Sequence, residues 1–490
     1  MQKLLIRLLS TVLLLSGCAV SNEKTYDLVI TGGRVIDPET GLDAVRNVGI
    51  VNGQIKVITE KPLLGQQTLE ASGLVVSPGF IDLHAHGQNI VGQTYQVRDG
   101  VTTAMDLEWG YSLPKLGDER NGKSLINYGT SACYYDARFF AKNSDRHEGK
   151  AIEKVELQKT HHEIANEVER RKILAFIERE LNAGAVGIGL PLAYMSEGID
   201  DEELEAIFDL SVRRNVPLFV HIRVADDPLD PSGFQELIDM TRKTGASLHM
   251  VHIVSTAGQR TSRYIEMMTQ AQAEGLDITT ELYPYTASST GINAAFFDDD
   301  NWQSKRGLSY SDIAWSLTGE RFTGKAMWDE YRKEYLDGII IIYGMKEEWV
   351  EKAMAHPDII VASDGMYTEE MAQRSHPRGR GTYARVLGLY VREKKILTLP
   401  DAIKKLTLLP AKRLENFTPM MKLKGRVQVG ADADITVFNP DEVIDLATFE
   451  KPNQYSKGIT HVIVAGQVVV KNEIIQNEVF PGKPINTKGD

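Results

Sequence analysis

The central part of the chain alternates short apolar segments with amphipathic segments of helical length, and this alternation constrains the fold most strongly. The repeating pattern is strand-like, then helical, along 185–190, 201–214, 216–221, 233–243, 247–252, 262–274 and 277–280. Strands separated by one helix each indicate βαβ units with parallel pairing. Enough units fit between residues 81 and 414 to close a barrel. We therefore predict an α/β fold built on a TIM-like (β/α)8 barrel.

Both ends of the chain have a different, β-like pattern. Short apolar runs fill residues 26–76, and similar runs return as ADITVF from Ala433 and HVIVAGQVVV from His461. Asn52-Gly53 between two such runs is a strong hairpin signal. Because short strands cannot bury their faces alone, we predict that 26–80 and 415–480 together form one small β-sandwich beside the barrel 81–414.

One stretch, about 287–335, interrupts the barrel rhythm. It carries three consecutive aspartates and many aromatic residues, and it shows no clean strand pattern. Long excursions in compact domains are usually functional, so we interpret it as an inserted lid.

The first of the two cysteines belongs to a targeting signal. Lys3 and Arg7 precede an apolar stretch, 8–15, that is too short to span a membrane and ends in LSGC at Cys18. This resembles a bacterial lipobox, which predicts a signal peptide at 1–17, a lipidated Cys18 and a tether at 18–25. A plain secretory peptide is the alternative. In lipoproteins of this kind Ala19 favours the outer membrane, so we expect an exported protein anchored on its periplasmic face.

Charge excludes some partners. The 55 Lys and Arg against 67 Asp and Glu give a net charge of −12 without any basic block, so nucleic acid is not expected. The same negative charge does not attract anionic lipid, so the acyl chains must supply the membrane anchor.

Histidines at strand ends carry the chemistry. Residues 78–86 read PGFIDLHAH, and side chains two apart on a strand point the same way, so His84 and His86 can hold one ion. His221, His252 and Asp364 each follow another apolar strand, at the end where barrels keep their active sites. Neutral imidazoles with a carboxylate suit Zn²⁺. By strand alternation, His249 should point away from His252 as a core or helix-facing residue.

These motifs, in this order, resemble the amidohydrolase superfamily, and its D-aminoacylase (N-acyl-D-amino-acid deacylase) branch in particular. The matching elements are PGFIDLHAH at 78–86, GVTT at 100–103, HIR at 221–223, LYPYT at 282–286, SDG at 363–365, HPR at 376–378 and GADADI at 430–435. The resemblance implies a barrel with a β-sandwich and one or two zinc ions that activate water. Asp364 would then be the general base, and Tyr194, Tyr283 and Ser289 would lie near the substrate.

Two positions depart from that branch. Its metal-binding cysteine is missing after GVTT, where the chain reads AMDLEWG, so we predict Glu108 as the ligand that bridges two metals, with Asp106 as the rival. Its substrate-binding lysine is replaced by Val254. An anionic substrate head then needs another cation, since an unpaired buried charge is costly. We predict Arg378 for this role; the other candidates are Arg223, Arg260 and Arg380.

The leading functional hypothesis is deacylation of an N-acyl-D-amino acid. Val254 keeps two alternatives open, a cyclic-amide hydrolase of the dihydroorotase or hydantoinase type and an isoaspartyl dipeptidase. A catalytically dead lipoprotein that only binds a ligand would require loss of a metal position or of Asp364, and every position is occupied.

Overall fold

The computed structural model describes residues 25–87, 89–143, 162–223, 227, 229–367 and 375–488. The predicted signal peptide and Cys18 lie outside these ranges. Within them, the structure contains no helix whose length and apolar character would suit a membrane span.

Parallel strands close into the predicted barrel. One hydrogen-bonded sheet has the order β6-β8-β9 and the other β10-β11-β12-β13-β14-β18. The strands are β6 (Phe80–Asp82), β8 (Val101–Asp106), β9 (Asn127–Thr130), β10 (Ala132–Cys133), β11 (Ile188–Pro191), β12 (Leu218–His221), β13 (Leu248–Met250), β14 (Ile278–Leu282) and β18 (Ile360–Val361). Parallel pairing of β7 (Ala85–His86) with β19 (Gly365–Met366) joins the first strand region to the last. The (β/α)8 prediction is confirmed.

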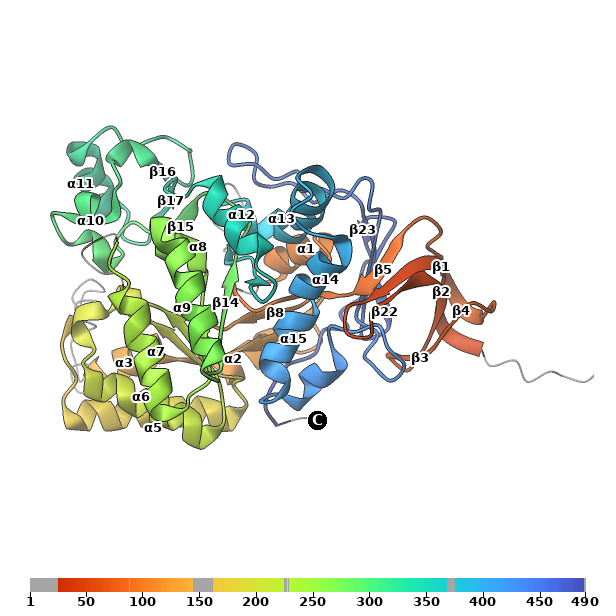
Figure 1. The fold of residues 1–490 in the computed structure, drawn as a ribbon, viewed down its shortest axis with the longest axis horizontal. Coiled ribbons are helices and arrows are strands. Elements are labelled where there is room, and N and C mark those ends of the chain that lie inside the picture. Colours follow the sequence, from red (N-terminus) through yellow and green to blue (C-terminus); the bar gives the residue numbers. More distant parts are fainter. Residues whose placement is uncertain are drawn as a thin grey trace, which may run out of the picture.

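Helices cover the outside of this barrel (Figure 1). They include α1 (Ile90–Arg98), α5 (Glu167–Ala183), α6 (Asp201–Arg214), α7 (Ser232–Thr244), α9 (Thr261–Ala273), α12 (Glu347–Ala355), α14 (Leu399–Leu406) and α15 (Leu408–Glu415). Helix α6 has the predicted bounds because its ends are strongly marked. Asp200 caps the N-terminus by accepting a hydrogen bond from the Glu203 amide, and Asn215 ends the helix in the left-handed conformation.

Both chain ends form one nine-stranded sheet, drawn at the right of Figure 1. Its strands are β1 (Thr25–Asp37), β2 (Leu42–Val51), β3 (Gln54–Thr59), β4 (Leu64–Glu70), β5 (Val75–Pro78), β20 (Ile435–Phe438), β21 (Ile459–Val464), β22 (Gln467–Lys471) and β23 (Ile474–Ile475). Antiparallel pairing of β5 with β20 joins the two halves. A bridge between Gln54 and Asp432 brings β3 back against the β20 side, so the sheet wraps around its own core.

The insert after β14 contains strands, which corrects the expectation of none. Strands β15 (Ser288–Gly291), β16 (Ile313–Trp315) and β17 (Ile339–Ile342) form an antiparallel sheet beside α10 (Trp302–Arg306) and α11 (Lys325–Glu334). Each strand is only three or four residues long and pairs across a long loop, which hides the pattern in the sequence. An aromatic cluster that includes Trp302 and Trp328 fills the interior of this lid.

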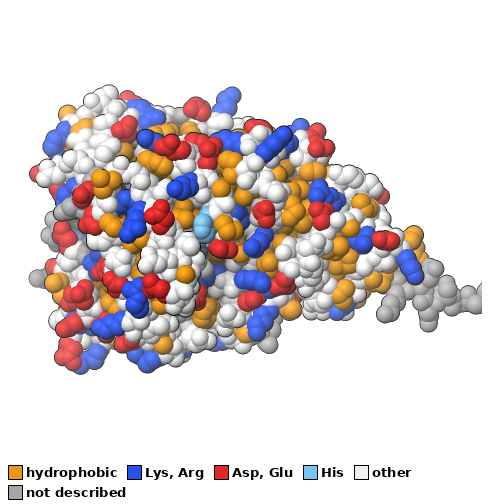
Figure 2. Space-filling view, viewed as in Figure 1, with side chains coloured by type: hydrophobic (Ala, Val, Ile, Leu, Met, Phe, Trp, Pro, Cys, Tyr) orange, Lys and Arg blue, Asp and Glu red, His pale blue; other side chains and the backbone are white. Residues whose placement is uncertain are grey.

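Charged side chains on the face shown in Figure 2 are of mixed sign, with acidic and basic groups interspersed. This distribution agrees with the absence of a basic block in the sequence.

Candidate metal and catalytic site

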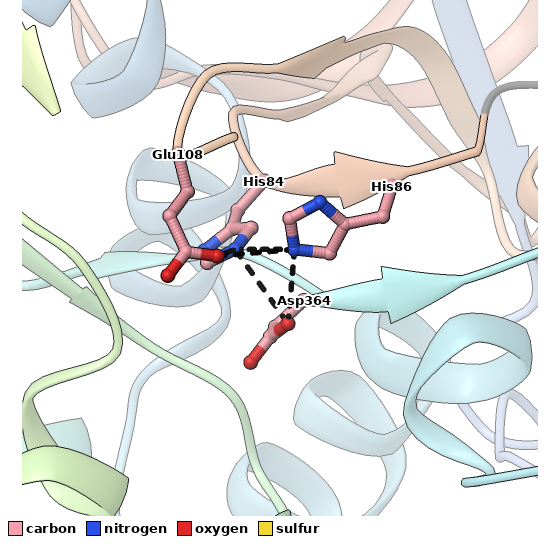
Figure 3. Close-up of side chains that lie close together, drawn as sticks. All are labelled: His84, His86, Glu108 and Asp364. Carbon is pink, nitrogen blue, oxygen red and sulfur yellow. Dashed lines mark hydrogen bonds and ion pairs between the residues drawn. The ribbon is translucent and has the colours of Figure 1, made fainter. Parts of the chain in front are cut away.

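Metal-binding side chains meet at the mouth of the barrel in two groups. His84, His86, Glu108 and Asp364 have donor atoms within 4.8 Å of one another, and so do Glu108, His221 and His252. Figure 3 shows the first four side chains pointing toward one another. The structure therefore brings together every predicted metal position and the predicted base, and Glu108 belongs to both groups.

Glu108 spans the two groups with its two oxygens. Oε2 lies 2.9 Å from His84 Nε2 and 3.1 Å from His86 Nε2. Oε1 lies 2.7 Å from His221 Nδ1 and 3.5 Å from His252 Nε2. Burial alone would raise the pKa of Glu108, but the surrounding imidazoles outweigh it and hold the pKa well below the usual value. An ionised carboxylate with one oxygen on each side is suited to bridging two cations.

A glycine on β11 allows the backbone at Glu108 to approach closely. Glu108 follows the end of β8 by two residues, and its backbone packs against Gly189 of β11. A Cβ at position 189 would lie 2.4 Å from the Glu108 carbonyl oxygen, so any side chain there would displace the loop. Gly189 thus permits the close approach that carries the carboxylate into the mouth.

A carboxylate contacts the Nδ1 atom of each of the first two histidines, His84 and His86. Glu281 Oε1 lies 2.5 Å from His84 Nδ1, and Asp106 Oδ1 lies 3.3 Å from His86 Nδ1. Such contacts fix the ring orientation and the tautomer of a ligand histidine. Asp106, the rival for the bridging position, lies behind His86 in this arrangement.

Sequence reasoning missed Glu281, whereas His249 is buried and hydrogen-bonded, as predicted for a core residue. Glu281 Oε2 lies 3.1 Å from His249 Nε2, and Glu281 Oε1 contacts His84 Nδ1. His249 therefore lies inside the barrel, with Glu281 between it and His84. Strand alternation does not continue from His249 to His252, because β13 ends at Met250 and His252 has a left-handed backbone with φ of 33°. The available signal for Glu281 was a glutamate within the strand segment ITTEL, since a carboxylate in a buried strand needs a partner.

Asp364 lies beside His84 and His86 of the first donor group. It has a left-handed φ of 50°, and its Oδ1 lies 3.5 Å from Nε2 of both His84 and His86. Its Oδ2 pairs with Arg378 Nη1 at 2.9 Å. Burial favours the neutral acid, but the charge of Arg378 outweighs it and holds the pKa of Asp364 well below its usual value. Strand β19 begins directly after Asp364, so Asp364 caps none of the described helices; the next of these is α13 (Arg378–Arg385).

A pocket of about 610 Å³ opens above these groups. Its lining includes Tyr194, Tyr283 and Ser289, the three residues expected near the substrate. The Tyr194 hydroxyl lies 3.1 Å from Thr290 Oγ1, and Ser289 Oγ donates to the Ile340 carbonyl at 3.0 Å. The Tyr283 hydroxyl is buried without a hydrogen-bond partner in the described part of the chain.

The predicted arginines do not line this pocket. Arg378 pairs with Asp364 and stacks 4.6 Å from the Tyr283 ring centre, directly behind the lining. Arg380 contacts Ser375 and Tyr95, and Arg223 pairs with Glu236 at 3.1 Å, so both are engaged elsewhere. Arg260 donates to backbone carbonyls of its own helix region. Val254 is buried and leaves no cation at that position.

Comparisons with known proteins agree with this geometry. A model described as "Amidohydrolase family" matches residues 367–470. An N-acyl-D-glutamate deacylase of Alcaligenes xylosoxydans xylosoxydans is 28% identical over 91% of this chain and 94% of its own length. The chain is thus similar to amidohydrolases over most of its length. A dihydroorotase of Pelotomaculum thermopropionicum is a more distant relative, 24% identical over 92% of this chain and 100% of its own length.

A solved amidohydrolase structure shares the fold. The N-acyl-D-glutamate deacylase of Bordetella bronchiseptica, solved with zinc and a phosphonate inhibitor, has a TM-score of 0.77 and 24% identity, covering 94% of this chain and all of that one. The donor set of the present protein, imidazole nitrogens with carboxylate oxygens, fits a divalent metal of borderline character.

Proposed function

We propose that this amidohydrolase hydrolyses an amide bond with the help of a divalent metal, and that its substrate is an N-acyl-D-amino acid. The observation that carries the proposal is Glu108, whose two oxygens belong to two donor groups under one pocket. The relatives named for deacylation of N-acyl-D-amino acids support the choice of substrate class. Zinc, one or two ions per chain, is the proposed metal.

His84, His86, Glu108, His221 and His252 would hold the metal, with Asp364 beside the first group. When bound, the metal polarises the scissile carbonyl and makes the attacking water more acidic.

Asp364 moves the proton in this proposal. Its low pKa keeps it ionised at neutral pH, so it can accept a proton from the attacking water and return it to the leaving nitrogen. The ion pair with Arg378 orients the carboxylate over the mouth. Burial raises the pKa of Tyr283, so its hydroxyl stays protonated and can donate a hydrogen bond to the charge that develops on the substrate oxygen.

A cyclic amide is the second candidate substrate, because Val254 leaves the lysine position of deacylases without a cation and dihydroorotases are among the relatives. The test is a parallel screen of purified, zinc-loaded enzyme. N-acetyl-D- and N-acetyl-L-amino acids and isoaspartyl dipeptides are assayed by release of primary amine, and dihydroorotate and hydantoins by loss of the ring. Turnover confined to cyclic amides would replace the first proposal with the second.

The membrane anchor is a separate proposal that rests on the LSGC sequence ending at Cys18. We infer export, lipidation of Cys18 and attachment to the periplasmic face of the outer membrane. Metabolic labelling with palmitate and density-gradient fractionation test it. Label and outer-membrane location should both be lost in Cys18→Ala; label that survives in this variant would contradict the anchor.

A further inference from the structure

Arg306 is a cation in the pocket wall that none of the sequence motifs indicated. It is the last residue of α10 in the lid, and its guanidinium lies 3.9 Å from the ring centre of Phe296. Its Nη2 atom is buried and has no hydrogen-bond partner among the described residues. Asp337 also lines this pocket.

Several buried arginines of this protein have carboxylate partners. Arg138 pairs with Glu203 at 2.6 Å, and Arg378 pairs with Asp364 at 2.9 Å. Within the described ranges, Arg306 has no such partner although it faces the cavity.

Arg306 carries its charge at neutral pH. Burial lowers its pKa to about 10, which still leaves the guanidinium protonated at pH 7. An enclosed cation without a counter-ion is unfavourable, and a carboxylate relieves that cost while forming charge-assisted hydrogen bonds to the planar guanidinium. A pocket with this feature is therefore suited to a ligand that brings its own anion.

The position of Arg306 indicates where that anion lies on the ligand. The Tyr194 ring is 5.3 Å from the ring of His221, and it is 5.6 Å from the ring of Phe296, which Arg306 covers. Two aromatic rings, those of Tyr194 and Phe296, thus lie between Arg306 and the metal position at His221. The wall on that side includes neutral residues such as Thr290 and Ile339.

Building on the proposed function, we propose that Arg306 binds a second carboxylate of the substrate, distal to the scissile amide. The amide lies over Glu108 and Asp364, and the distal carboxylate reaches the lid. Two sources share this chemistry, an acidic side chain of the amino acid and a dicarboxylic acyl group.

Matched substrate pairs test the proposal and separate the sources. N-acetyl-D-glutamate is compared with N-acetyl-D-glutamine, and N-succinyl-D-alanine with its neutral succinamoyl analogue. For one of these pairs the wild type should prefer the charged member. Arg306→Met should lower kcat/KM for that charged member about 30-fold or more and leave the neutral member within about threefold.

Lys305→Met is the matched control, since Lys305 is the neighbouring cation of the same helix and pairs with Asp299. This variant should keep the charged-to-neutral ratio of the wild type. A wild type without preference in either pair, or equal loss on both members in Arg306→Met, overturns the role of Arg306 and leaves the proposed function standing.

A binding measurement keeps the two proposals separable. Glutarate should raise the unfolding temperature of the zinc-loaded wild type and of Lys305→Met, but not that of Arg306→Met. Absence of turnover on every N-acyl amino acid would overturn the proposed function, while this pattern of glutarate stabilisation would still support the anion site. Equal stabilisation of all three proteins would overturn it.

Discussion

The interior of the wrapped terminal sheet and the mouth of the barrel are equally buried but chemically opposite. In the sheet the buried positions are filled by side chains such as Val35, Ile435 and Val437, none of them more than 1% exposed. At the mouth, His84, Glu108 and Asp364 are 0%, 3% and 7% exposed. Ionisable groups are almost never buried to this degree unless they are paired or bind a metal.

The two regions also differ in where left-handed backbone conformations occur. In the sheet, left-handed residues sit in hairpin turns, as at Asn52. At the mouth, His252 and Asp364 are left-handed although neither lies in a hairpin turn. Such residues cost about 1–3 kcal/mol each and persist when the surroundings enforce them. The comparison teaches that the sheet contributes stability, whereas the mouth uses part of that stability to hold a reactive arrangement.

The largest expected effect comes from exchanging aspartate for asparagine in each region. Asp364→Asn should lower kcat about 10²–10⁴-fold, because an amide cannot accept the proton. Metal content should stay at the wild-type level, since the histidines and Glu108 remain. The measurements are kcat and metal content by atomic absorption, and near-normal turnover would remove Asp364 as the base.

Asp434→Asn is the matched exchange in the sheet. Asp434 is buried and accepts a hydrogen bond from Lys424 at 2.6 Å and one from the Ala465 amide at 2.7 Å. Its loss should lower the free energy of unfolding by about 3 kcal/mol and leave kcat of the folded enzyme unchanged. If Asp434→Asn also lost turnover at full folding, the separation of the two regions would be wrong.

Metal content should depend on Glu108 far more than on Asp106. Glu108→Ala removes the one carboxylate shared by both donor groups, so at least one metal should be lost per chain. Asp106→Ala removes only the group behind His86 and should weaken metal affinity about 10–100-fold while saturating zinc restores occupancy. Full metal content in purified Glu108→Ala would contradict the bridging position.

Removing apolar volume tests the sheet itself. Ile435 lies in β20, is fully buried and packs in the core of the wrapped sheet. Ile435→Ala should lower the free energy of unfolding by about 2–5 kcal/mol, measured by denaturant titration, because it deletes buried methyl groups and leaves a cavity. The kcat of the remaining folded protein should equal that of the wild type.

Metal binding should depend less on Glu281, which contacts His84, than on the metal ligands themselves. Glu281→Gln keeps the shape but weakens the contacts to His84 and His249. We expect metal affinity to fall about 10–100-fold, with kcat at saturating zinc close to the wild-type value. Competition with a chelator measures the affinity, and an unchanged metal dissociation constant would show that Glu281 does not position His84.

Much of the fold was predictable because its signals are local. The alternation of strands and helices predicted the barrel, and the amphipathic pattern of 201–214 predicted the bounds of α6. The lid strands escaped, because β17 pairs with β15 and β16 across long loops and no local pattern records such pairing.

The site divides in the same way. Histidines at strand ends could be recognised in the sequence, because the strands that precede them have a clear pattern. Glu281 and Arg306 could not be recognised, because their importance depends on which residues lie opposite them in space. Only the fold shows that Glu281 lies between two histidines and that Arg306 faces the cavity without a counter-ion among the described residues.

The smallest expected effect concerns the junction between the two regions. Asp99 follows α1 of the barrel and accepts hydrogen bonds from the backbone amides of Tyr383 and Ala384 and from Ser456 Oγ, which lies among the C-terminal residues. Burial raises its pKa to about 8, well above the ordinary value of a carboxyl group. The folded protein therefore holds a proton here that the unfolded chain releases near pH 4, so stability falls as pH rises from about 4 to 8.

Between pH 6 and 7 this group should lower the free energy of unfolding by at most about 1.4 kcal/mol. Asp99→Asn mimics the neutral acid and should remove this contribution. Denaturant titrations of both proteins at pH 6 and pH 7 measure it; an identical pH dependence in the two would show that Asp99 is ionised in the folded protein.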